Sequence, residues 1–407
     1  MASAALALAV GVSSLAGVVD GRIVERQLEV WWFDLVAEPG DRVLVVNASA
    51  SAGCPADELD DAVVEVIDVE RFSEGDAWVR AETSLAELSY EQLQQLGGDC
   101  VVYRAAYVRR DQVLACNCLR PQADWMWRLR QQLGGRQLRQ LFLPGTHDSA
   151  AYAKYLGAVS DNVATKYAVA QAEDLLTQLH YGVRYLDMRI SYQPLTAARF
   201  WTCHGSYLFR PLVNDTALVR RFLADGRDVV IFDIHGLENF DGQPQAVHDE
   251  LQQLLLEQLA PWMAPKSLGW NVTLDQLWSI DRRLIVTYND DAGRDNPFLW
   301  PAVRHEWGDV QSLDDLETWL ESVMERAAQG LMPAHPWSAQ AELTPDAGDV
   351  LVDRFGGLRG AADIVNRNAT LWFRQRWSSL AAIVSSDFFL GTDMVQLAID
   401  ENLRRSP

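Results

Sequence analysis

Histidine, aspartate and arginine side chains follow several apolar, strand-like runs of the sequence. His147 and Asp148 come directly after LFLPGT, Asp187 and Arg189 lie within YLDMR, and His204 ends the run WTCH. Two histidines with separate carboxylate partners can act as general base and general acid on opposite sides of a reacting centre. An arginine between them can hold a phosphate in the planar fork of its guanidinium group. The set therefore predicts a metal-free, in-line attack on a phosphodiester.

Two other interpretations of these residues stay open from the sequence. A single histidine is most often a hydrogen-bonded core or loop residue, although four of the seven histidines (147, 204, 235 and 335) follow strand-like runs. A histidine beside an aspartate can also ligate a metal ion. Arg189 lies two residues from Asp187, on the same face of a strand, and its positive charge disfavours a divalent cation there. Cys203 lies inside a strand-like run, which indicates a plain buried thiol.

The elements that must position these side chains alternate between strand and helix patterns after residue 120. Strands are expected at 138–144, 184–190, 199–205, 227–236, 282–290, 331–336 and 380–389, and helices at 169–183, 212–226, 245–259, 313–330, 361–377 and 392–403. Seven or eight such units predict a complete or distorted (β/α)8-type TIM barrel at 121–407, whose site lies at the carboxyl ends of the strands. An open doubly wound sheet is the alternative, but no G-x-G-x-x-G motif follows the first strand.

Short β-type runs separated by turn signals fill the chain before residue 120. They are LEVWWFDLV, RVLVVNAS, VVEVIDV, AWVRAET, CVVYRAAYV and QVLACNCL. Spacing of about ten residues is typical of an all-β sandwich, so a small sandwich-like domain is expected at 21–120. It contains no histidine, and we expect no catalysis in it.

Composition and the cysteine pattern favour the secretory pathway. The formal net charge of −21 argues against nucleic acid and against a polybasic membrane anchor. Residues 1–20 are apolar and small, of the length of a signal peptide, with a frayed terminus or an edge strand as the alternatives. Four cysteines (54, 100, 116 and 118) suit two disulfides better than a zinc site, with Cys116 and Cys118 each reaching back to Cys54 or Cys100. Four N-x-S/T sequons, at Asn47, Asn214, Asn271 and Asn368, predict a secreted glycoprotein.

The motifs of the second half resemble those of a known family. LPGTHDSAAY (143–152), GVRYLDMRI (182–190), CHG (203–205), VVIFDIHG (229–236), ELTPD (342–346) and VSSDFF (384–389) stand in the order found in the X-domain of phosphatidylinositol-specific phospholipases C. The resemblance covers roughly residues 125–400. Single-barrel bacterial-type enzymes and animal X-domain-containing proteins are the most similar members.

The resemblance assigns a role to each catalytic residue. His147 is similar to the general base that takes the proton of the inositol 2-hydroxyl, and Asp387 to the carboxylate that orients it. His204 is similar to the general acid that protonates the diacylglycerol oxygen, with Asp148 as its helper. Arg189 resembles the phosphate clamp of the bacterial type, with Asp187 beside the phosphate or bracing Arg189. Asp148 and Arg189 indicate the calcium-independent type, so no cofactor is expected.

The positions that would bind the inositol depart from the family. Bacterial enzymes have a lysine near the end of the fourth strand, where the aligned region of this chain reads Phe232-Asp233-Ile234-His235. Asn289 or a neighbour stands where they have a basic residue after the fifth strand. Trp337 and Gln340 are candidates to line the inositol pocket, and a packing role for Trp337 is equally open. These departures weaken the transfer of substrate specificity more than that of the chemical step.

The expected function is therefore phospholipase C-type cleavage of a phosphatidylinositol or glycosyl-phosphatidylinositol lipid at a membrane surface. A catalytically weak or inactive X-domain protein that binds headgroups, glycans or a protein partner is the alternative. A glycerophosphodiesterase-like or sphingomyelinase-D-like barrel is a third hypothesis. Such barrels use a metal-binding set of Glu and Asp near the first histidine, and this sequence does not contain that set. We expect the protein to reach its lipid partner at the membrane surface without a transmembrane segment.

Overall fold

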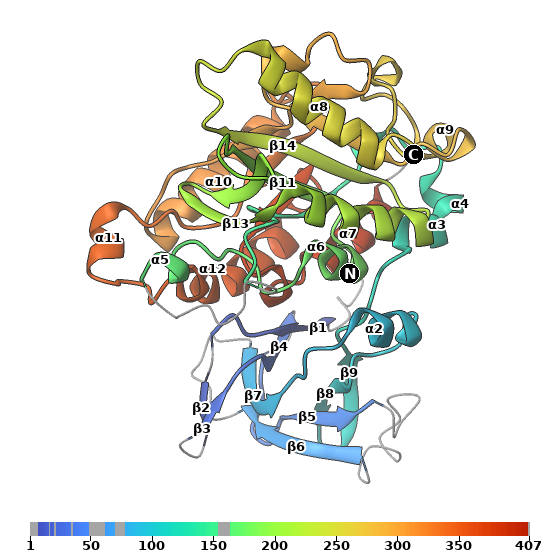
Figure 1. Ribbon diagram of the computed structural model, residues 1–407. Coiled ribbons are helices and arrows are strands. Elements are labelled where there is room, and N and C mark those ends of the chain that lie inside the picture. Colours follow the sequence, from blue (N-terminus) through green and yellow to red (C-terminus); the bar gives the residue numbers. More distant parts are fainter. Residues whose placement is uncertain are drawn as a thin grey trace. The chain divides into compact units, whose positions relative to one another are not determined.

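The computed structural model describes residues 7–15, 17–19, 22–33, 36–48, 62–69, 78–153 and 163–405. The chain divides into two compact units. One comprises Met1–Gln122 and Leu390–Asp393, and the other comprises Ala123–Phe389 and Met394–Pro407. Figure 1 shows both units coloured along the sequence.

The small unit is built from β-strands and one short helix. Its strands are β1 (Ala7–Val12), β2 (Gly17–Val19), β3 (Arg22–Val24), β4 (Gln27–Phe33), β5 (Arg42–Asn47), β6 (Val63–Asp68), β7 (Trp78–Ser84), β8 (Tyr103–Arg109) and β9 (Gln112–Asn117). They form a three-stranded sheet β1-β4-β7, a four-stranded sheet β6-β5-β8-β9 and the pair β2-β3. Alternating residues of the two larger sheets share one apolar core, with Val30 and Trp32 from one sheet and Val43 and Tyr107 from the other. The unit is thus mainly β, as expected, but it also contains helix α2 (Tyr90–Leu96).

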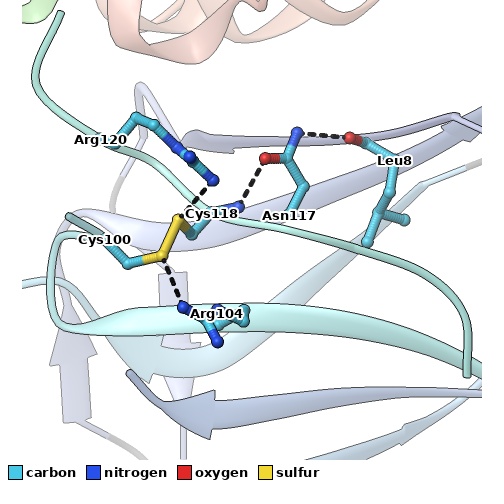
Figure 2. The surroundings of a disulfide bond; sticks show 6 residues. All are labelled: Leu8, Cys100, Arg104, Asn117, Cys118 and Arg120. Carbon is cyan, nitrogen blue, oxygen red and sulfur yellow. Dashed lines mark hydrogen bonds between the residues drawn. A yellow bond between two sulfur atoms is a disulfide. The ribbon is translucent and has the colours of Figure 1, made fainter. Parts of the chain in front are cut away.

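A disulfide joins Cys100 to Cys118 at the end of β9, where Figure 2 shows its surroundings. Beside it, the Asn117 side chain donates a hydrogen bond to the carbonyl of Leu8 in β1 and accepts one from the Cys118 amide. This pair is one of those that the cysteine pattern allowed. Cys54 lies outside the described residues, so the second expected disulfide stays a prediction.

Part of the expected signal peptide forms strand β1 of the small unit. Strand β1 pairs antiparallel with β4 from Ala7↔Phe33 to Val12↔Leu28, and Ala9 is fully buried. Removing residues 1–20 would therefore take an edge strand out of the three-stranded sheet. The signal peptide and the glycosylation of the four sequons stay predictions.

The large unit is built around a curled, mostly parallel sheet. Its strands are β10 (Leu143–Thr146), β11 (Tyr185–Tyr192), β12 (Phe200–His204), β13 (Tyr207–Pro211), β14 (Val230–Glu238), β15 (Leu284–Tyr288), β16 (Leu299–Pro301), β17 (Arg304–Glu306), β18 (Trp337–Gln340) and β19 (Ile383–Ser386). The main path runs β16-β15-β14-β11-β10-β19-β18-β17, with β12 and β13 as an antiparallel extension of β11. Among the described strands β16 and β17 do not pair, so the curled sheet is left open between them.

Helices surround this sheet (Figure 1). They are α3 (Trp125–Arg128), α4 (Arg130–Leu133), α5 (Val163–Lys166), α6 (Leu175–Tyr181), α7 (Leu212–Asp225), α8 (Gln245–Leu259), α9 (Leu274–Ser279), α10 (Leu313–Ala328), α11 (Ala347–Leu351), α12 (Leu358–Trp372) and α13 (Met394–Arg404). None of the helices in the described ranges has the length and the apolar composition that crossing a bilayer requires.

The expected strand at 331–336 is wrong, because β18 begins only at Trp337. Pro333 and Pro336 lack a backbone N–H, so this segment cannot supply a central strand with its full ladder of hydrogen bonds. His335, expected at the end of that strand, lies before β18 instead, where its Nδ1 contacts the carbonyl of Pro336.

Candidate active site

A tight turn after β10 carries His147 and Asp148. The amide of His147 donates to the carbonyl of Ser386, and the amide of Asp148 donates to Oδ2 of Asp187, 3.0 Å away. Gln171 donates to the carbonyls of both His147 and Ser386 at 2.8 Å. Asp148 has a φ of 38°, a left-handed conformation that aspartate tolerates better than most residues. The turn is thus held from three neighbouring segments, which fixes the two side chains.

His147 is oriented by a carboxylate that lies 240 residues away in the sequence. Its Nδ1 is 2.8 Å from Oδ1 of Asp387, directly after β19, and its Nε2 accepts a hydrogen bond from Nη2 of Arg189 at 2.9 Å. The guanidinium group can only donate, so the lone pair of Nε2 accepts this hydrogen bond and Nδ1–H faces Asp387. This is the tautomer that a general base acting through Nε2 requires.

The electrostatic surroundings of His147 favour proton uptake. Burial alone would lower the pKa of His147, but the carboxylates of Glu342 and Asp387 outweigh it and raise this pKa to about 9. Burial also raises the pKa of Glu342, to about 8. Both carboxylate oxygens of Glu342 are buried and form no hydrogen bond within the described residues. Once ionised, above its pKa of about 8, Glu342 therefore acts on His147 through its charge.

Asp187 and Arg189 on β11 form the centre of the site. Nη2 of Arg189 is 3.3 Å from Oδ2 of Asp187, the oxygen that also accepts the Asp148 amide. Burial would raise the pKa of Asp187, but Arg189 and the nearby histidines hold it well below its usual range. The pKa of Asp148 is raised by burial, and His204 and Arg189 oppose this only in part. Asp187 is thus a fixed anion that braces both Arg189 and the turn.

His204 at the end of β12 faces His147 across the site. Their ring centroids are 6.1 Å apart and the rings are nearly perpendicular, at 89°. Nδ1 of His204 donates to the carbonyl of Ala168 at 2.8 Å and lies 3.7 Å from Oδ2 of Asp148. Asp148 therefore contacts His204 at an ionic distance, whereas the hydrogen bond that orients the ring goes to Ala168. The sequence did not identify this backbone partner.

A cavity of about 710 Å³ opens over these side chains, a size within the range of small-ligand pockets. Of the residues predicted from sequence, those that line it are His147, Arg189, His204, His235, Asn289 and Gln340. Asp148, Asp187 and Asp387 lie behind them and are buried. The side chain of Asn289 is held at the cavity by a hydrogen bond, which its Nδ2 donates to the carbonyl of His235 at 3.0 Å.

Trp337 does not line this cavity, contrary to the inositol-pocket prediction. Its side chain is 5% exposed and belongs to the apolar core that includes Val365 and Trp372 of α12. Successive strand residues point to opposite faces, so Trp337 and Ala339 of β18 face the helices, whereas Gln340 faces the cavity. Trp337 therefore takes the packing role that the sequence left open.

The cavity also contains residues that the sequence did not single out as site residues. Glu342 lies two residues after the end of β18, and His305 lies on the three-residue strand β17, beside His235. The ELTPD segment was a usable signal for Glu342, because it follows a strand in the resembled family's order. No local pattern marks β17, so His305 could not be placed.

The charge of Glu342 makes a direct prediction for His147. Replacing Glu342 by glutamine should lower the pKa of His147 from about 9 toward the ordinary 6.5, because one of the two carboxylates that raise it is lost. An NMR titration of the His147 ring would measure this shift. Glu238→Gln, an exposed carboxylate lining the same cavity, is the matched control. A pKa that stays near 9 in Glu342→Gln would mean that Asp387 alone holds the proton.

The geometry suits acid–base chemistry on an anionic centre. Two imidazoles lie with their centroids 6.1 Å apart, and a guanidinium group that can bind an anion is hydrogen-bonded to one of them. The arrangement can take a proton on one side of that centre and deliver one on the other.

Comparisons with known proteins agree with this architecture. No family model matches the chain. It is 28% identical over 307 residues to PI-PLC X domain-containing protein 3 of Mus musculus, covering 69% of this chain and 93% of that protein. It is 30% identical over 224 residues to PI-PLC X domain-containing protein 1 of Mus musculus, covering 50% of this chain and 64% of that protein.

The fold has a counterpart among solved structures. Phosphatidylinositol-specific phospholipase C from Staphylococcus aureus superposes with a TM-score of 0.53 at 14% identity, covering 69% of this chain and 97% of that one. The likeness supports a phospholipase C-like fold for the large unit. Its sheet, its ordered motifs and these comparisons agree, and the chain is therefore similar to the PI-PLC X domain-containing proteins in sequence and to phospholipase C in fold.

Proposed function

We propose that the large unit, as a distorted (β/α) barrel, cleaves a phosphatidylinositol or glycosyl-phosphatidylinositol lipid as a phospholipase C. The observation that carries this proposal is the pair His147 and His204, 6.1 Å apart over a cavity, with Arg189 hydrogen-bonded to the first of them. Each histidine has a separate polar partner, as a two-step proton relay requires.

In the proposed reaction Nε2 of His147 removes the proton of the inositol 2-hydroxyl. The freed oxygen forms a bond to the phosphorus, and the bond from phosphorus to the glycerol oxygen breaks. His204 donates a proton to that glycerol oxygen, giving diacylglycerol and a cyclic inositol phosphate. Asp387 stabilises the imidazolium of His147, and Arg189 stabilises the charge that develops on the phosphate.

The chemical step needs no metal ion in this proposal. Arg189 lies between Asp148 and Asp187, at 3.8 and 3.3 Å, and supplies the positive charge that a cation would otherwise bring. His235, Asn289 and Gln340 line the same cavity and are proposed to bind the headgroup hydroxyls.

The decisive assay is incubation of the purified chain with phosphatidylinositol in detergent micelles and EDTA. Formation of a cyclic inositol phosphate, followed by phosphorus NMR, is the expected result. Complete inactivity toward inositol lipids, with calcium or without, would contradict the proposed function.

One observation favours a second candidate, a weakly active or inactive protein that binds headgroups. Arg189 occupies the lone pair of His147 that the base needs, so catalysis requires Arg189 to turn away toward the phosphate. In a binding protein this hydrogen bond would persist. Saturable binding of inositol phosphate without turnover would favour this candidate.

Access to lipid is proposed to depend on an apolar rim at the cavity. Leu351 and Val352, at the end of α11, are 85% and 72% exposed, and Val350 beside them lines the cavity. With a net charge of −21, apolar contact rather than attraction to anionic lipid would hold the enzyme at a membrane.

Replacing both rim residues by aspartate should lower cleavage of lipid in phosphatidylcholine vesicles by at least about tenfold, because two apolar side chains lose their burial in the bilayer. Cleavage of a soluble inositol phosphodiester should not change. Leu331→Asp, 66% exposed and not among the residues that line the cavity, is the matched control. Equal losses on vesicles and on the soluble substrate would contradict the role of the rim.

We also propose that the protein passes through the secretory pathway. The Cys100–Cys118 disulfide supports this, because such bonds persist mainly in oxidising compartments.

A further inference from the structure

Three potential metal ligands meet at the wall of the cavity. Asp233 and His235 come from β14 and His305 from β17, and one ligand atom from each lies within 4.8 Å of the others. Oδ2 of Asp233 is 3.4 Å from Nδ1 of His235 and 3.5 Å from Nε2 of His305. Nδ1 of His235 is buried and forms no hydrogen bond within the described residues. Hydrogen bonding within this part of the site is therefore incomplete.

The spacing fits a tetrahedral ion. With metal bonds of about 2.0–2.1 Å, neighbouring ligand atoms of a tetrahedral zinc site lie about 3.4 Å apart. The two distances to Asp233 match this value, but the rings of His235 and His305 are stacked face to face and must rotate before both lone pairs can point at one ion. A donor set of two imidazoles and one carboxylate suits Zn²⁺ and its neighbours better than Ca²⁺ or Mg²⁺, which prefer oxygen.

The surroundings hold the carboxylate in place, as outer-shell contacts do in metal sites. The hydroxyl of Thr287 donates to Oδ1 of Asp233, and the hydroxyl of Tyr185 donates to Oδ2 at 2.5 Å. Asp233 is fully buried, whereas His235 and His305 line the cavity. An ion bound by the three would thus have its remaining position toward the cavity.

We propose that Asp233, His235 and His305 bind a divalent transition-metal ion of the Zn²⁺ class, which keeps its fourth position open to an oxygen of the cavity's ligand. The site shares no residue with His147, His204 or Arg189. It adds a second, separate anchor for an anionic or hydroxyl-bearing ligand. It does not take part in the proposed chemical step, which needs no metal ion at the reacting phosphate, although it uses His235, one of the residues proposed to bind the headgroup.

A metal-free network is the competing explanation of the same geometry. The hydroxyl of Tyr185 lies 2.7 Å from Nε2 of His305, and the rings of His235 and His305 are stacked with centroids 3.3 Å apart. Metal binding must displace the contact between Tyr185 and His305 and separate the two stacked rings, because an imidazole binds a metal in the plane of its ring. The two explanations therefore differ in whether the full chain takes up an ion.

The test is calorimetric titration of the full chain with Zn²⁺, paired with the absorption spectrum of the Co²⁺ form. We expect one ion per chain, a cobalt spectrum typical of tetrahedral coordination, and a change in that spectrum when inorganic phosphate is added. His235→Gln and Asp233→Asn should each weaken binding by about 100-fold or more, as the loss of one ligand in three requires. Circular dichroism would establish that these variants are folded.

Two control variants decide which residues bind the ion. His335→Gln, which removes a histidine that does not line the cavity, should leave binding unchanged. His147→Gln should also leave it unchanged, because His147 is not a ligand. Loss of the ion in His147→Gln but not in His235→Gln, or no uptake by the wild-type chain at millimolar Zn²⁺, would overturn the proposed site. A cobalt spectrum unaffected by phosphate would overturn its open position.

Discussion

Replacing His204 by alanine should reduce cleavage of phosphatidylinositol by about 10³-fold while sparing a substrate whose leaving group needs no proton. The glycerol alkoxide is a strong base and leaves only with a proton, which His204 supplies. A 4-nitrophenyl ester of inositol phosphate releases a weakly basic phenolate, so it should lose less than about tenfold. Replacing His147 by alanine should cost about 10³-fold on both substrates, because the 2-hydroxyl must be deprotonated in either case. Steady-state kcat/KM on the two substrates measures both effects.

Measuring both substrates separates the loss of a catalytic group from the loss of the folded structure. A variant that merely misfolds loses both substrates equally, whereas loss of the general acid does not. His335→Ala, outside the residues that line the cavity, should behave as wild type on both. If His204→Ala lost both substrates to the same extent while remaining folded, His204 would be a binding residue rather than the acid.

The sequence predicted the elements whose patterns are long and missed the short ones. Helix α8 spans 245–259, as its apolar periodicity indicated. Strands β16 and β17 have three residues each, too few to show a period, so the strand that carries His305 was missed. Helix α2 was also missed, although the capping box of Ser89 and Gln92 marks its start.

The sequence pattern predicts some features of the candidate site and not others. Reading strand ends brought His147, Arg189 and His204 to one cavity, because parallel strands present their carboxyl ends at one edge. The register of β18 decides that Gln340 faces inward and Trp337 outward, and alternation alone would have predicted this. The hydrogen bond from His204 to Ala168 could not be predicted, because it depends on a backbone carbonyl that any residue would supply.

Arg189 is expected to contribute through both its charge and its shape. Arg189→Gln should lower kcat/KM by about 10³-fold, and Arg189→Lys by about 10²-fold, because lysine keeps the charge but loses the planar fork. Arg304→Lys is the matched control, since Arg304 lines the same cavity but its Nε pairs with Glu306 at 2.8 Å. It should retain activity within about threefold, because lysine keeps the positive charge beside Glu306 and Arg304 has no role in the proposed reaction.

The pH profile distinguishes the two contributions of Arg189. Its positive charge lowers the pKa of His147, which the carboxylates raise to about 9. The base works only when neutral, so activity rises as pH increases through this pKa. Arg189→Gln should move that rise to higher pH, Arg189→Lys should leave it in place, and Glu342→Gln should move it to lower pH. A profile unmoved in Arg189→Gln would mean that the guanidinium does not act on the charge of His147, and its hydrogen bond would then be only positional.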